Sequence, residues 1–247
     1  MFKVGASANK RKAVDRDASA TGRRERNRQD KRERIRDAAE DLFNECGYDA
    51  ATTRDIARRA GVSLGTLFNY ADDKRDLIFL IWVDRLDRIT AEAFAGLSDG
   101  DLLQQLLRAF GCWYQAFARQ PALARLLLKE LAFYSSGRLA ADFQNSRRRT
   151  IDQVRMLVIR AQTRGELRPE LDPGMVSRAI FFTHAGAIRW WIAADKPARS
   201  KGLAQLCELL ALQLDGMRVP RARARARRSD EKSSPSPRRY SRARTTP

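Results

Sequence analysis

The polar side chains between Thr52 and Tyr70 are of types that form hydrogen bonds, and their spacing places them on two short helices. The segment reads TTRDIARRAGVSLGTLFNY, and its apolar residues fit two helices that cross steeply at a turn. Polar groups on the exposed face of the second helix would meet base edges in the major groove of DNA. The chemistry that this segment supports is therefore noncovalent contact with DNA through a helix-turn-helix.

Individual residues mark the turn and both helix starts of this segment. Ala57 is small where the helix axes come closest, and Gly61 tolerates a positive φ at the corner. Thr52 and Asp55 have the spacing of a capping box, and Ser63 can cap the second helix. These signals predict where both helices begin.

Further helices are expected on both sides of the pair. Before the pair, apolar residues recur at i, i+3, i+4, i+7, i+8 and i+11, which predicts one apolar face of a helix that ends before Gly47. These residues are Ile35, Ala38, Ala39, Leu42, Phe43 and Cys46. After the pair, Asp73 and Asp76 have capping-box spacing for another helix. Lys74 in the first turn of that helix opposes the helix dipole, which favours a phosphate contact over a structural role.

With these residues in register, the chain closely resembles the TetR family of bacterial transcriptional regulators. The resemblance runs from about residue 35 to residue 80, through AAEDLFNECGYDAATTRDIARRAGVSLGTLFNYADDKRDL. It implies an all-α fold, in which a three-helix DNA-binding domain over residues 29–73 precedes a larger helical bundle over residues 74–217. In this family the bundle binds a ligand and forms a dimer.

The resemblance also implies which side chains would contact DNA. Base contacts would come from Arg54, which can form two hydrogen bonds with a guanine, and from the exposed face of Leu64, Thr66 and Asn69. Phosphate contacts would come from Thr53, Tyr70 and Lys74. Phe68 stands among them where the family commonly has tyrosine, so a hydroxyl is missing. The alternatives are a solvated face for Arg54, core packing for Tyr70 and a surface charge for Lys74.

The formal charge of +18 lies almost entirely at the two ends of the chain. Residues 1–34 carry +7 and residues 218–247 carry +9, which leaves +2 for the middle. Both ends lack apolar periodicity, so residues 1–28 and 218–247 are expected to be disordered basic tails. Two interpretations stay open, a solvated arginine run and a nonspecific clamp on DNA phosphates.

The region from residue 74 to residue 217 predicts five to six helices. On the helix from about Asp101 to Arg119, aromatic residues recur at i, i+3, i+4 and i+7, which is typical of ordinary core and also of a pocket wall. The residues expected around an apolar ligand pocket are Trp82, Leu86, Ile89, Phe110, Trp113, Tyr114, Phe117, Phe143, Ile151, Arg155 and Phe181.

Of the last two helices of this region, the first carries apolar residues on more than one face and the second carries a leucine stripe. The first must be buried on both sides, either as a central helix of a monomer or within a four-helix bundle formed by two subunits. The resemblance favours the homodimer. The residues expected at its interface are Ala179, Phe182, Gly186, Trp190, Leu203, Leu206, Leu210 and Leu214.

The remaining chemistry-bearing residues are few. The single histidine, His184, is expected to be a hydrogen-bonded core or interface residue, with a ligand contact as the alternative. No second ligand of suitable spacing accompanies it, so no metal site is expected. The three cysteines lack paired spacing and are expected to be buried free thiols.

These observations predict a regulator and exclude most enzymes. By resemblance, the protein is a repressor that binds a palindromic operator and is released by a small apolar or aromatic ligand, without a cofactor. A nonspecific, nucleoid-type packaging protein is the alternative, because it would share the basic tails. An enzyme would need a nucleophile with a base, paired carboxylates or a metal set, none of which is evident. Without a long uncharged apolar run or signal peptide, we expect a cytoplasmic, nucleoid-associated protein.

Overall fold

A computed structural model describes residues 5–131 and 137–219 of the 247-residue chain, with side chains from residue 22 onward. This part of the chain is all-α, and its only β pairing is an isolated bridge between Leu167 and Arg218. The helices are α1 (Gly5–Glu45), α2 (Gly47–Ala50), α3 (Thr53–Arg59), α4 (Leu64–Phe68), α5 (Lys74–Phe94), α6 (Leu102–Arg119), α7 (Pro121–Leu131), α8 (Ala140–Thr163), α9 (Pro173–Ile192) and α10 (Arg199–Asp215).

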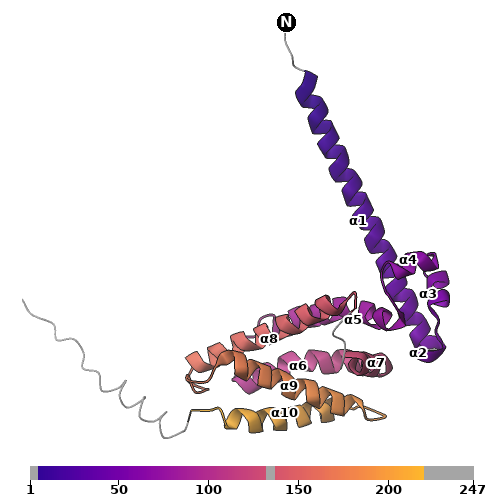
Figure 1. Ribbon diagram of the computed structural model, residues 1–247. Coiled ribbons are helices and arrows are strands. Elements are labelled where there is room, and N and C mark those ends of the chain that lie inside the picture. The colour runs from indigo at the N-terminus through magenta and orange to yellow at the C-terminus, as the bar shows by residue number, and fades with distance from the viewer. Residues whose placement is uncertain (1–4, 132–136, 220–247) are drawn as a thin grey trace, which may run out of the picture.

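Two groups of helices are visible along the chain (Figure 1). Helices α2, α3 and α4 pack beside the C-terminal part of α1, and α5 carries the chain from them into a bundle of α5 to α10. Within this bundle α8 packs on α9, and α10 packs on both α6 and α9. The six helices from α5 to α10 confirm the number predicted for this region.

The long first helix differs from the prediction for residues 1–28. We expected a disordered tail, whereas α1 begins at Gly5 and projects past the rest of the molecule (Figure 1). Alanine, arginine, lysine and glutamate favour the helix, and no proline interrupts residues 5–45. Residues 22–31 are exposed, in keeping with their lack of apolar periodicity, which does not exclude a helix. Of the other tail, 218–247, only residues 218 and 219 lie within the described part.

The apolar stripe of α10 faces its own bundle, contrary to its predicted place at the dimer interface. Leu206, Leu210 and Leu214 are fully or almost fully buried within the single chain, and Leu203 packs against the same core. Helical periodicity identifies an apolar face but not what covers it, and α6 and α9 cover this one. The three cysteines are free, as predicted, but their predicted burial was wrong, because Cys46 is exposed and the other two are partly exposed.

Gly202 is required where α10 crosses α6 and α9. A Cβ atom there would lie 2.6 Å from Cδ1 of Trp191 and 2.7 Å from Cε1 of Tyr114. These two buried rings also pack on each other, so neither can withdraw easily. We expect Gly202→Ala to lower the free energy of unfolding by about 1–3 kcal/mol, which is typical of overpacking.

Urea unfolding measures this change, and Gly111→Ala on the facing helix is the matched control. A Cβ atom on Gly111 would meet side-chain atoms of α10 only at ordinary contact distances of 3.8 and 3.9 Å. We expect no loss of stability from the control, because alanine also favours the helix. Equal losses in both variants would contradict the packing argument.

Candidate DNA interface and ligand pocket

The helix-turn-helix forms with the predicted caps and turn. The side chains of Thr52, Ser63 and Asp73 accept hydrogen bonds from the backbone nitrogens three residues later, which stabilises the starts of α3, α4 and α5. Gly61 at the corner has φ +64°, and Gly47 after α1 has φ +81°. The local sequence therefore sets the geometry of this motif.

Most of the residues proposed to meet DNA share the open side of α3 and α4. Arg54, Phe68 and Asn69 are exposed, and Thr53, Leu64 and Thr66 are partly exposed. The Arg54 side chain has no ion pair or hydrogen bond to the described part of the chain. Its guanidinium is therefore available to a partner.

Lys74 has a structural role that the sequence did not reveal. Its Nζ donates to the carbonyl oxygens of Tyr48 at 2.7 Å and of Asp49 and Ala51 at 3.2 Å. Nζ also lies 4.4 Å from the centroid of the Tyr48 ring. An ammonium group has three donors, and all three are used, so the expected phosphate contact is replaced by a cap on the carbonyl end of α2.

Tyr70 is likewise engaged within the protein. Its hydroxyl donates to the backbone oxygen of Arg28 at 3.2 Å, and its ring is partly buried against the core. The single hydroxyl proton is thus used to hold the end of the helix-turn-helix against α1. This contact supports the packing alternative for Tyr70 over the phosphate contact.

A cavity of ≈ 200 Å³ lies in the bundle between α5, α6, α7, α8 and α9. Five of the predicted residues line it, namely Leu86, Trp113, Phe117, Phe143 and Phe181. The lining residues that the prediction missed, or placed elsewhere, are Thr90, Leu127, Leu128, Leu131, Ser146, Arg147, Thr150, Phe182, His184, Ala185, Ile188 and Arg189.

The other predicted pocket residues lie behind or beside this cavity. Trp82, Ile89, Phe110 and Tyr114 are buried in the core and do not line it. Ile151 and Arg155 border a separate surface depression on α8 and α9. Two residues of the aromatic stripe on α6, Trp113 and Phe117, therefore line the cavity. The other two, Phe110 and Tyr114, are buried in the core.

His184 is a buried polar residue in the wall of the cavity. Its ring is 4% exposed and stacks on Phe110, with 4.0 Å between ring centroids and 7° between ring planes. Its Nδ1 atom is buried without a hydrogen-bond partner in the described part of the chain, contrary to the predicted hydrogen-bonded ring. The nearby hydroxyls of Thr90 and Thr150 are already paired with each other at 3.1 Å. His184 is therefore available to a polar atom of a ligand.

Burial and, to a smaller extent, the charge of Arg189 lower the pKa of His184 to about 3, so the ring is neutral near pH 7. An unfolded chain binds a proton at this residue below about pH 6.5, while the folded chain does not until about pH 3. Folding stability contributed by His184 is therefore complete above pH 6.5 and decreases as the pH falls through this window.

We expect the free energy of unfolding to fall by about 1 kcal/mol per pH unit below pH 6.5 through this residue. Urea unfolding at pH 7 and pH 5 measures the loss. His184→Phe keeps a ring against Phe110 without a titrating nitrogen, so we expect a smaller loss in this variant. An identical loss in both proteins would contradict the role given to His184.

The chain is similar to known bacterial regulators. The sequence model described as "Bacterial regulatory proteins, tetR family" matches residues 35–81, which span the end of α1, the helix-turn-helix and the start of α5. The HTH-type transcriptional regulator HbdR of Aromatoleum sp. (strain CIB) is 28% identical over 176 residues, which are 68% of this chain and 73% of HbdR. The chain belongs to the TetR family of bacterial transcriptional regulators.

Solved structures of TetR-family regulators share the fold. Thermus thermophilus FadR, described as a transcriptional repressor in complex with lauroyl-CoA, is 24% identical, with a TM-score of 0.59 over 76% of this chain and 96% of that one. Bacillus subtilis FadR in complex with stearoyl-CoA is 20% identical, with a TM-score of 0.60 over 74% and 98%. The TetR-like arrangement of a helix-turn-helix domain and a helical bundle is therefore confirmed.

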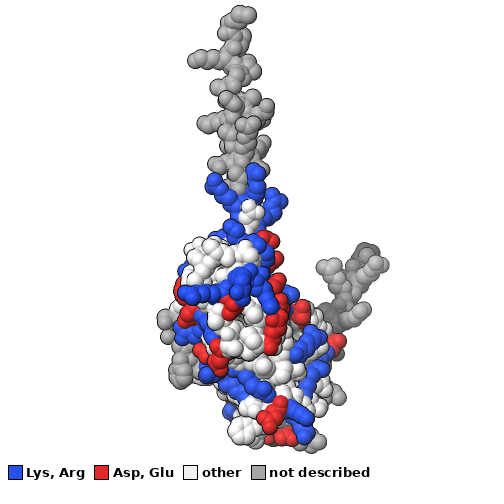
Figure 2. Space-filling view, turned by 90° about the vertical axis from the view of Figure 1, so that its right-hand side faces the viewer, with Lys and Arg blue, Asp and Glu red and all other residues white. Residues whose placement is uncertain are grey.

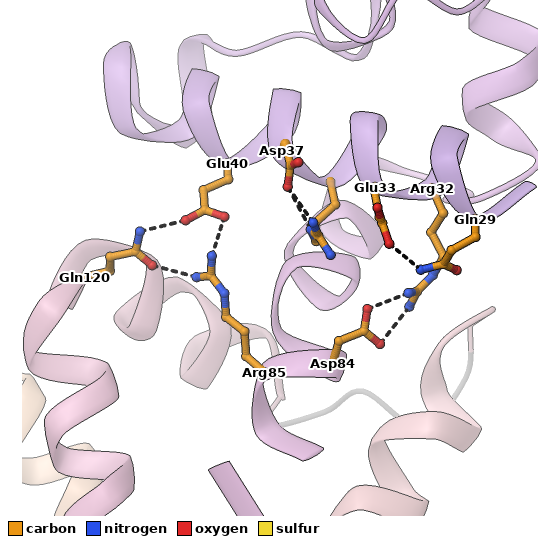
Figure 3. A network of polar contacts seen from close by, with 9 residues as sticks. Gln29, Arg32, Glu33, Asp37, Glu40, Asp84, Arg85 and Gln120 are labelled. Atoms are coloured by element: carbon orange, nitrogen blue, oxygen red, sulfur yellow. Dashed lines mark hydrogen bonds and ion pairs between the residues drawn. The ribbon is translucent and has the colours of Figure 1, made fainter. Parts of the chain in front are cut away.

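A polar network joins the two parts of this TetR-family chain (Figure 3). Arg85 on α5 donates to Glu40 on α1 and, at 2.7 Å, to the side-chain oxygen of Gln120 at the end of α6. Gln120 in turn donates to Glu40 at 2.7 Å. Burial raises the pKa of Glu40, but hydrogen bonds from Arg85 and Gln120 outweigh it, so its pKa is lowered and the carboxylate stays charged.

Two further ion pairs reinforce the junction. Arg32 on α1 binds both carboxylate oxygens of Asp84 on α5 (Figure 3). Arg138, just before α8, binds Asp72 at 2.7 Å beside the end of α4. Helix α5 thus holds the DNA-binding domain at Asp84 and Arg85 and lines the cavity at the next residue, Leu86.

An apolar surface on α9 and α10 has no cover within the described chain. Its large side chains are 40–77% exposed, and they are Met175, Phe182, Trp190, Leu209 and Leu212. Of the predicted interface residues, Ala179, Phe182, Gly186 and Trp190 are exposed or partly exposed. The sequence prediction thus identified accessible residues on α9, whereas on α10 the exposed leucines are Leu209 and Leu212 rather than those predicted.

The described residues include neither a metal-binding cluster nor a membrane-spanning helix. No group of three or more His, Cys, Asp and Glu side chains there is arranged to hold a metal ion. Within the same residues, no helix is long and apolar enough to cross a membrane.

Proposed function

We propose that this TetR-family regulator is a repressor that binds a palindromic operator as a homodimer and is released by an amphiphilic ligand. The observation that carries the proposal is the double role of α5. Asp84 and Arg85 hold α1 of the DNA-binding domain, while Leu86 and Thr90 line the cavity on the same helix. A ligand that moves α5 would therefore change the position of the reading helix.

The homodimer is supported by the exposed apolar surface of α9 and α10. Several large apolar side chains exposed on two packed helices are typical of an interaction site. The residues come from two helices near the end of the chain, so a two-fold axis could pair the same surface in both subunits. Such a dimer would place two reading helices in successive major grooves, about 34 Å apart, which predicts a palindromic operator.

The ligand class is supported by the chemistry of the cavity wall. The wall is mostly apolar, includes Arg147 and Arg189, and contains no carboxylate among its described residues. Such a site disfavours cations and suits an apolar chain that ends in an anionic group. The likeness to FadR structures bound to lauroyl-CoA and stearoyl-CoA points in the same direction. We propose a long-chain acyl thioester whose head group is anionic, such as an acyl-CoA, or a related anionic amphiphile.

Release would follow from a difference in affinity between two states. In one state the two DNA-binding domains of the dimer are spaced to fit the operator, and in the other they are not. A ligand that binds the second state more tightly lowers operator affinity by its difference in affinity for the two states and no more. The Glu40–Arg85–Gln120 network is the proposed link, since it joins α1, α5 and the end of α6. Because its target is chromosomal DNA, we propose that the protein acts in the cytoplasm at the nucleoid.

In vitro selection from random duplex DNA tests sequence recognition. Purified protein is incubated at physiological salt with excess nonspecific competitor, because phosphate contacts alone can retain DNA at low salt. We expect a palindrome with half-sites about one helical turn apart. Recovery of no shared sequence would contradict the proposal and favour the nonspecific packaging alternative.

A further inference from the structure

The face of α1 that packs on the helix-turn-helix continues beyond it as a row of cations. Ile35 is fully buried on this face. Lys31, Arg28 and Arg24 precede Ile35 by 4, 7 and 11 residues, so all three lie on the same side of the helix. At 1.5 Å per residue, Arg24 lies about 16 Å further along the axis than Ile35.

A contact at Arg28 shows that this face borders the end of the reading pair. The backbone oxygen of Arg28 accepts a hydrogen bond from the Tyr70 hydroxyl, just after α4. Arg34, about 100° around the helix from Ile35, donates to the backbone oxygen of Ala60 at the end of α3, at 3.2 Å. Arg32, on the side turned toward the bundle, instead binds Asp84 of α5. The helix therefore presents different sides to the reading pair and to the ligand-binding bundle.

The three cations are exposed and unengaged. The side chains of Arg24, Arg28 and Lys31 have no ion pair or hydrogen bond to any residue whose side chain the structure describes, and all are exposed. Lysine and arginine gather around the base of the projecting helix, above the helix-turn-helix (Figure 2). Like charges at this spacing repel one another along a helix, so they favour an anionic partner.

We propose that Arg24, Arg28 and Lys31 form a second DNA contact, which binds phosphates flanking the half-site read by α3 and α4. The inference rests on the proposed operator binding. Because α1 projects past α4 (Figure 1), this row reaches beyond the base pairs that the short reading helix can cover. Phosphate contacts of this kind add affinity and salt dependence without adding sequence preference.

Two arginines in the same short stretch point away from the row and supply a matched control. Arg26 lies about 180° around the helix from Ile35, and Arg23 lies about 120° away, on the side of Arg34. Both are exposed. The double variants Arg24→Ala/Arg28→Ala and Arg23→Ala/Arg26→Ala therefore remove the same charge from the same short stretch. Alanine favours the helix, so neither pair endangers folding.

The test measures the affinity of full-length protein for the selected operator as a function of salt, with two duplexes. One duplex ends at the half-sites, and the other extends about one helical turn beyond each. We expect the wild type to bind the extended duplex more tightly. We expect Arg24→Ala/Arg28→Ala to remove most of that gain and to lower the salt slope by about 2 per protomer, whereas the control keeps both.

Three results would overturn the inference: equal effects of both double variants, no effect of either, or no gain from flanking DNA in the wild type. Each leaves the proposed function intact if the protein still prefers its operator to competitor DNA. Loss of that preference in the wild type would instead contradict the proposed function itself.

Discussion

Replacing Trp190 with aspartate should leave the protein monomeric and weaken operator binding by more than about 100-fold. Trp190 is 75% exposed on the apolar surface of α9, and an aromatic anchor of this kind typically contributes much of an interface's binding energy. A buried, unpaired carboxylate would oppose association further. Two linked DNA-binding domains bind two half-sites far more tightly than one domain binds one half-site. Loss of the dimer therefore lowers operator affinity.

Sedimentation of the protein and fluorescence anisotropy with the operator measure both effects. Leu212→Asp, on α10 and 77% exposed, should act like Trp190→Asp because it belongs to the same surface. Met156→Asp is the control, since Met156 is an exposed apolar residue on α8, outside this surface. A dimer that persists in both interface variants would contradict the proposed interface.

Replacing Arg54 with alanine should weaken operator binding by roughly 10- to 100-fold and relax sequence preference at one position of each half-site. Arg54 is exposed at the start of α3 and has no partner in the described part of the chain, so a guanine contact would use its full hydrogen-bonding capacity. A bidentate contact of this kind is worth about 1–3 kcal/mol of discrimination. Binding to operators with single base substitutions measures both changes.

Arg58 provides the matched control for this prediction. It lies one turn later on the same helix, its side chain is 80% exposed, and it binds Asp55 at 2.6 Å. We expect Arg58→Ala to retain sequence preference and to lose little affinity. Equal losses in the two variants, with no change in preference, would mean that Arg54 acts only through its charge.

The helix-turn-helix could be predicted closely because its signals are local. Thr52, Ser63 and Asp73 each cap a helix through atoms three residues away, and Gly61 supplies a positive φ at one position. Lys74 could not be predicted in this way. Its partners are backbone carbonyls 23–26 residues earlier in the chain, and no spacing rule within one helix relates it to them.

The pocket and the interface were predicted less well because periodicity gives a face and not its neighbour. Phe110 and Trp113 belong to one stripe on α6, yet only Trp113 lines the cavity. On α10 the regular stripe ending at Leu214 packs inside the chain, and the exposed Leu212 lies between its members. His184 on α9 lines a cavity that is formed by five helices, so its place there depends on how those helices pack and not on its own sequence neighbours.

Control of DNA binding by the cavity is tested by the operator affinity of the wild type with and without saturating palmitoyl-CoA. Quenching of tryptophan fluorescence, to which Trp113 in the cavity wall would contribute, reports ligand binding independently. We predict that the ligand binds and that operator affinity falls at least about 10-fold, a coupling free energy of about 1.4 kcal/mol. Bound ligand with unchanged operator affinity would contradict the claim that the cavity controls the reading helices.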